Sequence, residues 1–112
     1  MILALGGCED GGTPSKVELI GDSEIGARRI DDAGCGSCHI IPGIRDAKGL
    51  VGPPLDHMAR RAYIAGLLRN TPGNMVSWLR SPQAIVPGNA MPDMGLSEQE
   101  ARDIAAYLAT LQ

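Results

Sequence analysis

The stretch Cys35-Gly36-Ser37-Cys38-His39 decides what the rest of this sequence predicts. It sets two thiols three residues apart and puts an imidazole directly after the second thiol. Gly36 and Ser37 are small, so the backbone between the two cysteines can lie close to a flat surface. The pattern is specific, because five consecutive positions must agree and three of them are cysteine or histidine.

A C-x-x-C-H sequence is typical of covalent haem c attachment. Cys35 and Cys38 would bond to the two vinyl groups of one macrocycle, and His39 would approach the iron from the proximal side. A thioredoxin-like redox pair would require a βαβ pattern nearby, which the sequence lacks. A zinc site would require two further ligands, and the only cysteine and histidine left to supply them are Cys8 and His57. The sequence therefore predicts one haem c per chain.

The composition is consistent with a small domain that a cofactor stabilises. The chain has 112 residues, with no Phe, one Trp and two Tyr, but 15 Gly and 8 Pro. A domain with so few aromatic side chains usually needs a disulfide, a metal or a cofactor. The net charge of −3 argues against nucleic-acid binding, which requires a basic surface. No apolar run approaches the length needed to span a bilayer.

The first 20 residues differ in character from the domain predicted for residues 21–112. Leu5-Gly6-Gly7-Cys8 follows a short apolar stretch and resembles the lipobox of a bacterial lipoprotein. Residues 1–20 are therefore interpreted as a lipoprotein signal remnant and flexible tether, with Cys8 lipidated. The alternative is a frayed N-terminus with a stray thiol.

Helix signals are clearest near the two ends of the predicted domain. The first helix is expected over Ser23–Ala33, with Asp22 as its N-cap and Gly34 just past its end. The last helix is expected to begin after Ser97, which forms an S-x-x-E capping box with Glu100. Both ends of the domain are therefore predicted to be helical.

Two further features predict how these helices pack. Gly26 lies inside the first helix at a cost in helix propensity, which indicates a close crossing with another helix. The apolar residues of the last helix share one face: Ala101, Ile104, Ala105, Leu108 and Leu111. Arg102 and Asp103 are expected to point away from that face.

The middle of the chain alternates between breakers and short helical segments. Residues 40–57 are predicted to be a loop, and a second short helix is expected over Met58–Leu68. A third helix is capped by Thr71 and ends before Pro82. Residues 81–96 are rich in Pro and Gly and are expected to be irregular. No strand is predicted.

The sixth coordination position of the iron needs a ligand from elsewhere in the chain. Met91 is the leading candidate, because it lies in the irregular segment 87–92, which has a proline at each end. Such a segment can lie across the distal face, and a thioether there raises the reduction potential. Met94 in the same loop is the rival ligand. A third candidate is His57, and a fourth reading is that the position is open.

Together these residues resemble the class I mono-haem c-type cytochromes over residues 21–112. The motifs that carry the resemblance are Gly21-Asp22, the segment from Cys35 to His39, Gly52-Pro53-Pro54-Leu55, Pro87-Gly88-Asn89-Ala90-Met91 and Ile104-Ala105-Ala106-Tyr107-Leu108. The resemblance implies the small all-α class I cytochrome c fold, with about four to five short helices wrapped around one covalent haem c.

A narrower resemblance is to the cytochrome c domain fused to subunit II of some bacterial haem–copper oxidases. Its motifs are Ala62-Tyr63-Ile64-Ala65-Gly66, Asn70-Thr71-Pro72 and Trp78-Leu79-Arg80. The chain has no room for the copper domain of those subunits.

The resemblance also implies roles for individual side chains. His39 and Met91 would be the axial ligands, and the carbonyl of Pro53 would accept a hydrogen bond from the His39 ring. Arg61 would bind a haem propionate, with a solvated helix face as the alternative. Trp78 is a candidate pocket-lining residue, with packing in the protein core as the alternative.

These expectations combine into a one-electron carrier rather than an enzyme. It would be a monomer in a respiratory chain, on the periplasmic side of the cytoplasmic membrane, either soluble or tethered through Cys8. Its partners would be redox proteins, such as a terminal oxidase or a dehydrogenase or cytochrome complex. A second hypothesis is a haem enzyme or a gas or peroxide sensor with an open distal site. A third is a haem subunit that acts only within a larger oxidoreductase complex.

Overall fold

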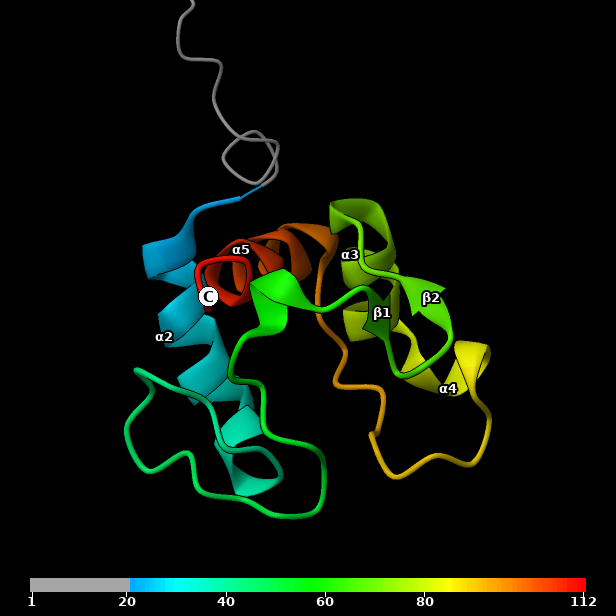
Figure 1. The fold of residues 1–112 in the computed structure, drawn as a ribbon, viewed down its shortest axis with the longest axis horizontal. Helices are drawn as coiled ribbons and strands as arrows, with labels where there is room; N and C mark the ends of the chain where they lie inside the picture. The colour runs from blue at the N-terminus through cyan, green and yellow to red at the C-terminus, as the bar shows by residue number, and fades with distance from the viewer. Residues whose placement is uncertain (1–20) are drawn as a thin grey trace, which may run out of the picture.

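The computed structural model describes residues 21–112, and within them the predicted all-α class is confirmed (Figure 1). The α-helices are α2 (Ser23–Ala33), α3 (Pro72–Arg80), α4 (Pro82–Ile85) and α5 (Glu98–Leu108). The 3-10 helices are η1 (Cys35–Ser37) and η2 (Met58–Arg60), and the strands are β1 (Tyr63–Ile64) and β2 (Leu68–Arg69). The lipobox with Cys8 and the tether predicted for residues 1–20 lie outside the described residues.

Helix α2 begins and ends where its capping residues predict. The Asp22 carboxylate accepts hydrogen bonds from the backbone N–H groups of Glu24 and Ile25, at 2.8 and 3.1 Å. Gly34 follows the helix in the left-handed conformation, with φ 76°, which costs glycine little. Local chemistry therefore accounts for both ends of this helix.

The caps of α3 and α5 are also confirmed. The Thr71 hydroxyl accepts from the backbone N–H of Asn74 at 3.1 Å. Ser97 and Glu100 form both bonds of the predicted capping box, at 3.0 and 2.8 Å. Each side chain satisfies a backbone donor that the first helical turn leaves unpaired.

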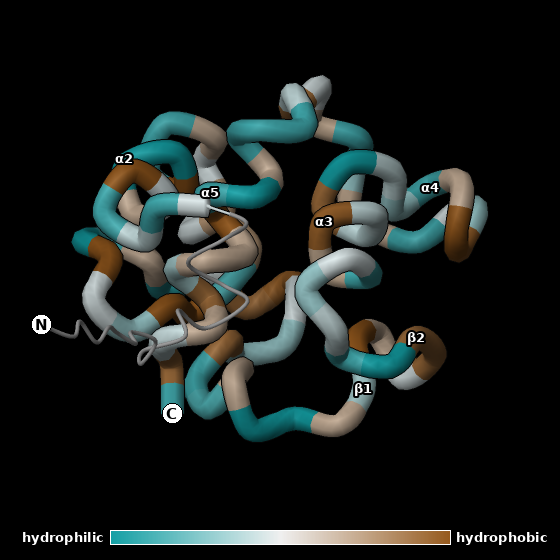
Figure 2. Tube along the Cα trace, turned by 90° about the horizontal axis from the view of Figure 1, so that it is seen from above, coloured by the Kyte–Doolittle hydropathy of each residue, from teal (hydrophilic) through white to brown (hydrophobic). Residues whose placement is uncertain are grey.

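Helices α2 and α5 cross closely, as Gly26 predicts, and lie against one another in both views (Figures 1 and 2). Gly26 is buried, and a Cβ at this position would overlap the carbonyl group of Asp103. Figure 2 shows hydrophilic and hydrophobic segments alternating along α2, as expected for a helix with one buried side. The crossing therefore depends on the missing side chain.

One expectation about α5 was wrong. Asp103 does not point away from the buried face: its side chain is buried, with 5% exposure. Its Oδ1 accepts from the backbone N–H of Asp22 at 2.9 Å and from Nε2 of Gln99 at 3.0 Å. A buried carboxylate is tolerated when it is hydrogen-bonded in this way, and here it ties the start of α2 to α5.

The helix expected over Met58–Leu68 was also wrong. Only η2 forms there, and the chain then turns back as an antiparallel hairpin in which Ile64 pairs with Leu68. Ala65 and Gly66 both have positive φ, 54° and 69°, which an α-helix cannot accommodate. The expectation that the chain has no strand fails for the same reason.

The segment after α3 has one short helix that was not expected. Pro82 occupies the first turn of α4, where its missing N–H costs nothing. Residues 86–97 then carry no helix or strand before α5 begins. The irregular character expected of residues 81–96 therefore applies to the part beyond α4.

The core lies where α3 packs on α5 and α5 on α2. Its largest members are Ile30, Ile41, Met58, Ile64, Met75, Leu79, Ile104 and Leu108. Most of the apolar face predicted for α5 is buried there: Ala101, Ile104, Ala105 and Leu108. Among the helices of residues 21–112, none combines the length and the apolar character that crossing a bilayer requires.

Candidate functional site

The Cys35-to-His39 motif forms a single tight turn directly after α2. The backbone N–H groups of Cys38 and His39 both donate to the carbonyl of Cys35, at 3.2 and 3.1 Å. In a 3-10 turn, residues three apart lie above one another. Both cysteines are free thiols and half-buried, so the turn places two thiols on one side of the chain.

The state of the Cys35 thiol bears on the thioredoxin-like interpretation. Burial raises the pKa of Cys35, the nearby Cys38 raises it further, and a backbone hydrogen bond acts in the opposite direction. A nucleophilic cysteine of a redox enzyme needs a lowered pKa instead. Cys35 therefore lacks the lowered pKa that the nucleophile of a thioredoxin-like pair would need.

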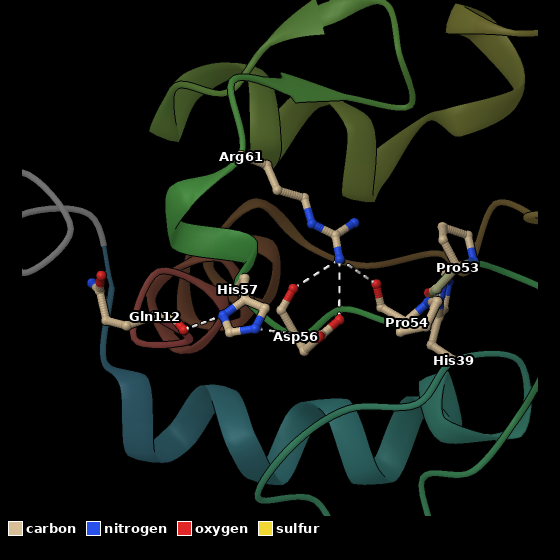
Figure 3. A network of polar contacts seen from close by, with 7 residues as sticks. All are labelled: His39, Pro53, Pro54, Asp56, His57, Arg61 and Gln112. Atoms are coloured by element: carbon tan, nitrogen blue, oxygen red, sulfur yellow. Dashed lines mark hydrogen bonds and ion pairs between the residues drawn. The ribbon is translucent and has the colours of Figure 1, made fainter.

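His39 is held by the carbonyl that the family resemblance implies. Its Nδ1 lies 2.7 Å from the carbonyl oxygen of Pro53 (Figure 3). A carbonyl can only accept, so Nδ1 carries the proton and Nε2 keeps its lone pair. The imidazole is therefore in the tautomer that presents Nε2 to a metal.

Two glycines bring the Pro53 segment against the motif. The N–H of Gly49 donates to the carbonyl of Gly36 at 2.9 Å, and the N–H of Gly52 donates to that of Cys38 at 2.7 Å. A Cβ on Gly49 would overlap the backbone of the motif, and one on Gly52 would lie 2.8 Å from Nδ1 of His39. The two glycines therefore form a cradle: Gly49 lets the backbone lie against the motif, and Gly52 leaves room for the His39 imidazole.

Arg61 braces the same segment. Its Nη2 donates to the carbonyls of Pro54 at 2.6 Å and Asp56 at 2.7 Å, and lies 3.3 Å from Oδ1 of Asp56 (Figure 3). Its side chain is only 34% exposed, so it is not simply part of a solvated face. The predicted contact between Arg61 and a haem propionate stays a prediction.

Met91 lies in the loop between α4 and α5, half-buried against the core. In Figure 1 this loop (yellow to orange) and the loop that follows His39 (cyan to green) extend from the same side of the helices. Met94, the rival ligand, is 42% exposed. Trp78 is half-buried on α3 and packs against the core, and its role beside a haem stays a prediction.

His57, the third candidate ligand, is engaged elsewhere. Its Nδ1 lies 2.5 Å from the backbone oxygen of Gln112, and its Nε2 lies 3.5 Å from Oδ2 of Asp56 (Figure 3). Both ring nitrogens therefore face groups of the protein. The choice of Met91 over Met94 and His57 as a ligand stays a prediction.

Two cavities in the described residues contain none of the predicted site residues. One, of about 280 Å³, lies between Met58, Met75 and Leu108. The other, of about 500 Å³, lies beside α3 and α5, near Arg80 and Arg102. The candidate site is therefore the turn of residues 35–39 with the segments that pack on it.

Comparison with known proteins agrees with this geometry. The family model described as Cytochrome c matches residues 23–112. The chain belongs to the cytochrome c family. The chemistry of this family is electron transfer by a covalent haem c, and this cytochrome c has the two thiols and the metal-ready imidazole that the group needs.

Two curated relatives share this domain. This cytochrome c is 31% identical over 87 residues to cytochrome c oxidase subunit 2 of Bacillus sp. (strain PS3), covering 74% of this chain and 24% of the relative. It is 33% identical over 106 residues to the cytochrome c-type cyt cy of Rhodobacter capsulatus, covering 83% of this chain and 51% of the relative. The cytochrome c thus spans about a quarter and about half the length of these relatives.

The sequence located the motif and the predicted ligands, but it gave no sign of the side chain that organises the Met91 loop. Gln83 of α4 bonds to three backbone groups of that loop. The sequence carries no signal for this role of Gln83, because the residue lies in a Pro- and Gly-rich segment with no catalytic motif around it.

Proposed function

We propose that this cytochrome c is a one-electron carrier of a respiratory chain, with His39 and Met91 as the axial ligands of its haem iron. When bound, the haem supplies an Fe(III)/Fe(II) couple. The protein attaches it through Cys35 and Cys38 and keeps both axial ligands in either oxidation state.

The observation that carries this proposal is the hydrogen bond between His39 and Pro53, at 2.7 Å. It fixes the ring orientation and leaves Nε2 for the metal, which is the arrangement that metal-bound histidines share. A thioether as the second protein ligand would fill the coordination shell, which would favour electron transfer over binding of gases or peroxide. Met91 is the half-buried thioether of an irregular loop, which supports it as that ligand.

The location and partners are part of the same proposal. The cytochrome c would act on the periplasmic side of the cytoplasmic membrane, soluble or tethered through Cys8. A relative named cytochrome c oxidase subunit 2 supports a terminal oxidase as its electron acceptor. The relative named cytochrome c-type cyt cy supports an independent electron carrier.

The test compares Met91→Ala with Met94→Ala in protein matured with covalent haem c. We expect Met91→Ala to lose the weak far-red Met-to-iron absorption, to bind carbon monoxide when ferrous, and to have a lower reduction potential. Met94→Ala should match the parent protein in all three measurements. If Met91→Ala also matches the parent, Met91 is not the ligand.

Carbon monoxide separates the carrier from a protein with an open distal site. A six-coordinate carrier keeps its ferrous spectrum when carbon monoxide is added. A shift in the spectrum of the parent protein would instead support a haem enzyme or sensor with an open distal position.

A further inference from the structure

One side chain, Gln83 of α4, organises the loop that carries Met91. Its Nε2 donates to the carbonyl oxygens of Asn89 and Met91, both at 2.8 Å. Its Oε1 accepts from the backbone N–H of Gly88 at 2.9 Å. A single amide therefore bonds to three backbone groups within four residues of loop.

Two side chains of the loop, those of Asn89 and Asp93, form further hydrogen bonds. Oδ1 of Asp93 accepts from the backbone N–H of Gln83 at 3.1 Å. Oδ1 of Asn89 accepts from the backbone N–H of Met91 at 2.6 Å, while its Nδ2 donates to the carbonyl of Pro82 at 3.1 Å. Both backbone polar groups of Met91 are thus bonded to side-chain amides, one from α4 and one from the loop itself.

We propose that Gln83 is the positioning residue that keeps the Met91 thioether at the haem iron in preference to Met94. The inference rests on the ligation proposed above. Ordering a loop without helix or strand costs conformational entropy, and the Gln83 amide offsets this cost through its bonds to Gly88, Asn89 and Met91. Met94 lies beyond the residues that the Gln83 amide binds and is 42% exposed.

The role requires an amide, because both ends of the side chain are used. A carboxylate of the same size can accept from Gly88 but cannot donate to the carbonyls of Asn89 and Met91. Gln83→Glu would therefore set negative oxygens against carbonyl oxygens with little change in volume. Gln83→Leu removes all three bonds by replacing the amide with an apolar side chain of similar size.

The test follows the far-red Met-to-iron absorption of the ferric holoprotein as pH is raised. In both Gln83 variants we expect the pH at which half of this absorption is lost to fall by about one unit. This shift corresponds to a tenfold larger population of protein without the Met ligand. The reason is that removing the Gln83 bonds leaves backbone polar groups of the loop unsatisfied. Both variants should also bind carbon monoxide faster when ferrous. Hydrogen exchange should increase in residues 86–96.

The matched control is Gln99→Leu, which removes the bond from another glutamine amide to Asp103 on α5. It should lower the thermal midpoint without moving the pH at which the absorption is lost. This comparison separates a positioning role from a general loss of stability.

Two outcomes separate the positioning role of Gln83 from the proposed ligation by Met91. If Met91→Ala loses the absorption while both Gln83 variants keep the parent midpoint and the parent rate with carbon monoxide, the role of Gln83 is refuted and the ligation stands. If Met91→Ala keeps the absorption, the ligation itself fails, and the role of Gln83 fails with it.

Discussion

The carbonyl oxygen of Pro53 lies 2.7 Å from Nδ1 of His39, and a Cβ on the preceding Gly52 would lie 2.9 Å from the other ring nitrogen. The hydrogen bond to Pro53 therefore orients the His39 ring, and the backbone at Gly52 packs directly against it. Orientation of a metal-binding histidine by its outer partners commonly affects metal affinity by about 10- to 100-fold. Because of this contact, any side chain at position 52 would collide with the His39 ring.

We expect Gly52→Ala to displace the His39 ring, because an added Cβ would overlap it. The result should be a lower yield of holoprotein and a shifted reduction potential in the fraction that matures. The measurements are the ratio of haem absorbance to protein and a redox titration.

Gly73→Ala is the matched control for Gly52→Ala. A Cβ on Gly73 would meet nothing within 4 Å, and Gly73 lies in the first turn of helix α3. Alanine there should not lower the free energy of unfolding, because it has the higher helix propensity. Equal yields and potentials for the two variants would contradict the cradle described for His39.

Gly26→Ala should disrupt the crossing of α2 and α5, since the new Cβ would overlap the backbone of Asp103. Overpacking a rigid contact typically costs about 1–3 kcal/mol, and we expect the upper end because backbone moves less easily than a side chain. Urea unfolding of the holoprotein measures the change. The neighbouring exposed Arg28→Ala should stay within about 0.5 kcal/mol of the parent, and a similarly small effect for Gly26→Ala would rule out a tight crossing.

Tyr107→Phe should lower the free energy of unfolding by about 1 kcal/mol. The Tyr107 hydroxyl donates to the carbonyl of Pro42 at 2.6 Å, which ties α5 to the loop after His39. Tyr63 of β1 is 54% exposed, so Tyr63→Phe is the control and should change stability by less than about 0.5 kcal/mol. The interpretation fails if urea unfolding places the two variants together.

Glu100 makes part of the stability depend on pH. The backbone N–H of Ser97 donates to its carboxylate, and this bond lowers the pKa of Glu100 below its usual value of 4.5. A lowered folded-state pKa contributes stability above the unfolded value, and this stability is lost as pH falls through the folded value. Urea midpoints at neutral and acidic pH should therefore differ more in the parent than in Glu100→Gln.

Glutamine can also complete a capping box, so Glu100→Gln should cost little at neutral pH. The control is Glu24→Gln. It removes a carboxylate from the first turn of α2, a helix that has no capping box. If Glu100→Gln keeps the full acid dependence of the parent, the capping carboxylate is not its source.

Expectations that depended on local chemistry were confirmed. The caps at Asp22, Thr71 and Ser97 each satisfy a backbone donor within three residues, so a short stretch of sequence contains all the information needed. The missing side chain of Gly26 predicted a close crossing, because a helix interior tolerates glycine only at a cost.

Two expectations that depended on distant parts of the molecule were wrong. The pattern over Met58–Leu68 suits a helix, yet a hairpin forms because Ala65 and Gly66 take left-handed conformations. Asp103 looks like a solvated residue in the sequence, yet it is buried because its carboxylate meets the start of a helix 81 positions away. Such partners are invisible to a local pattern.

The division is the same at the candidate site. By itself, the sequence determined the chemistry: two thiols and an imidazole in a five-residue motif, whose spacing along the chain sets what they can hold. Only the tertiary structure decided which ring nitrogen of His39 is free, through Pro53, and how Gln83 holds the loop of Met91. The reason is physical: residue type and spacing are properties of the chain, whereas the partner of a polar group is chosen only when distant segments pack.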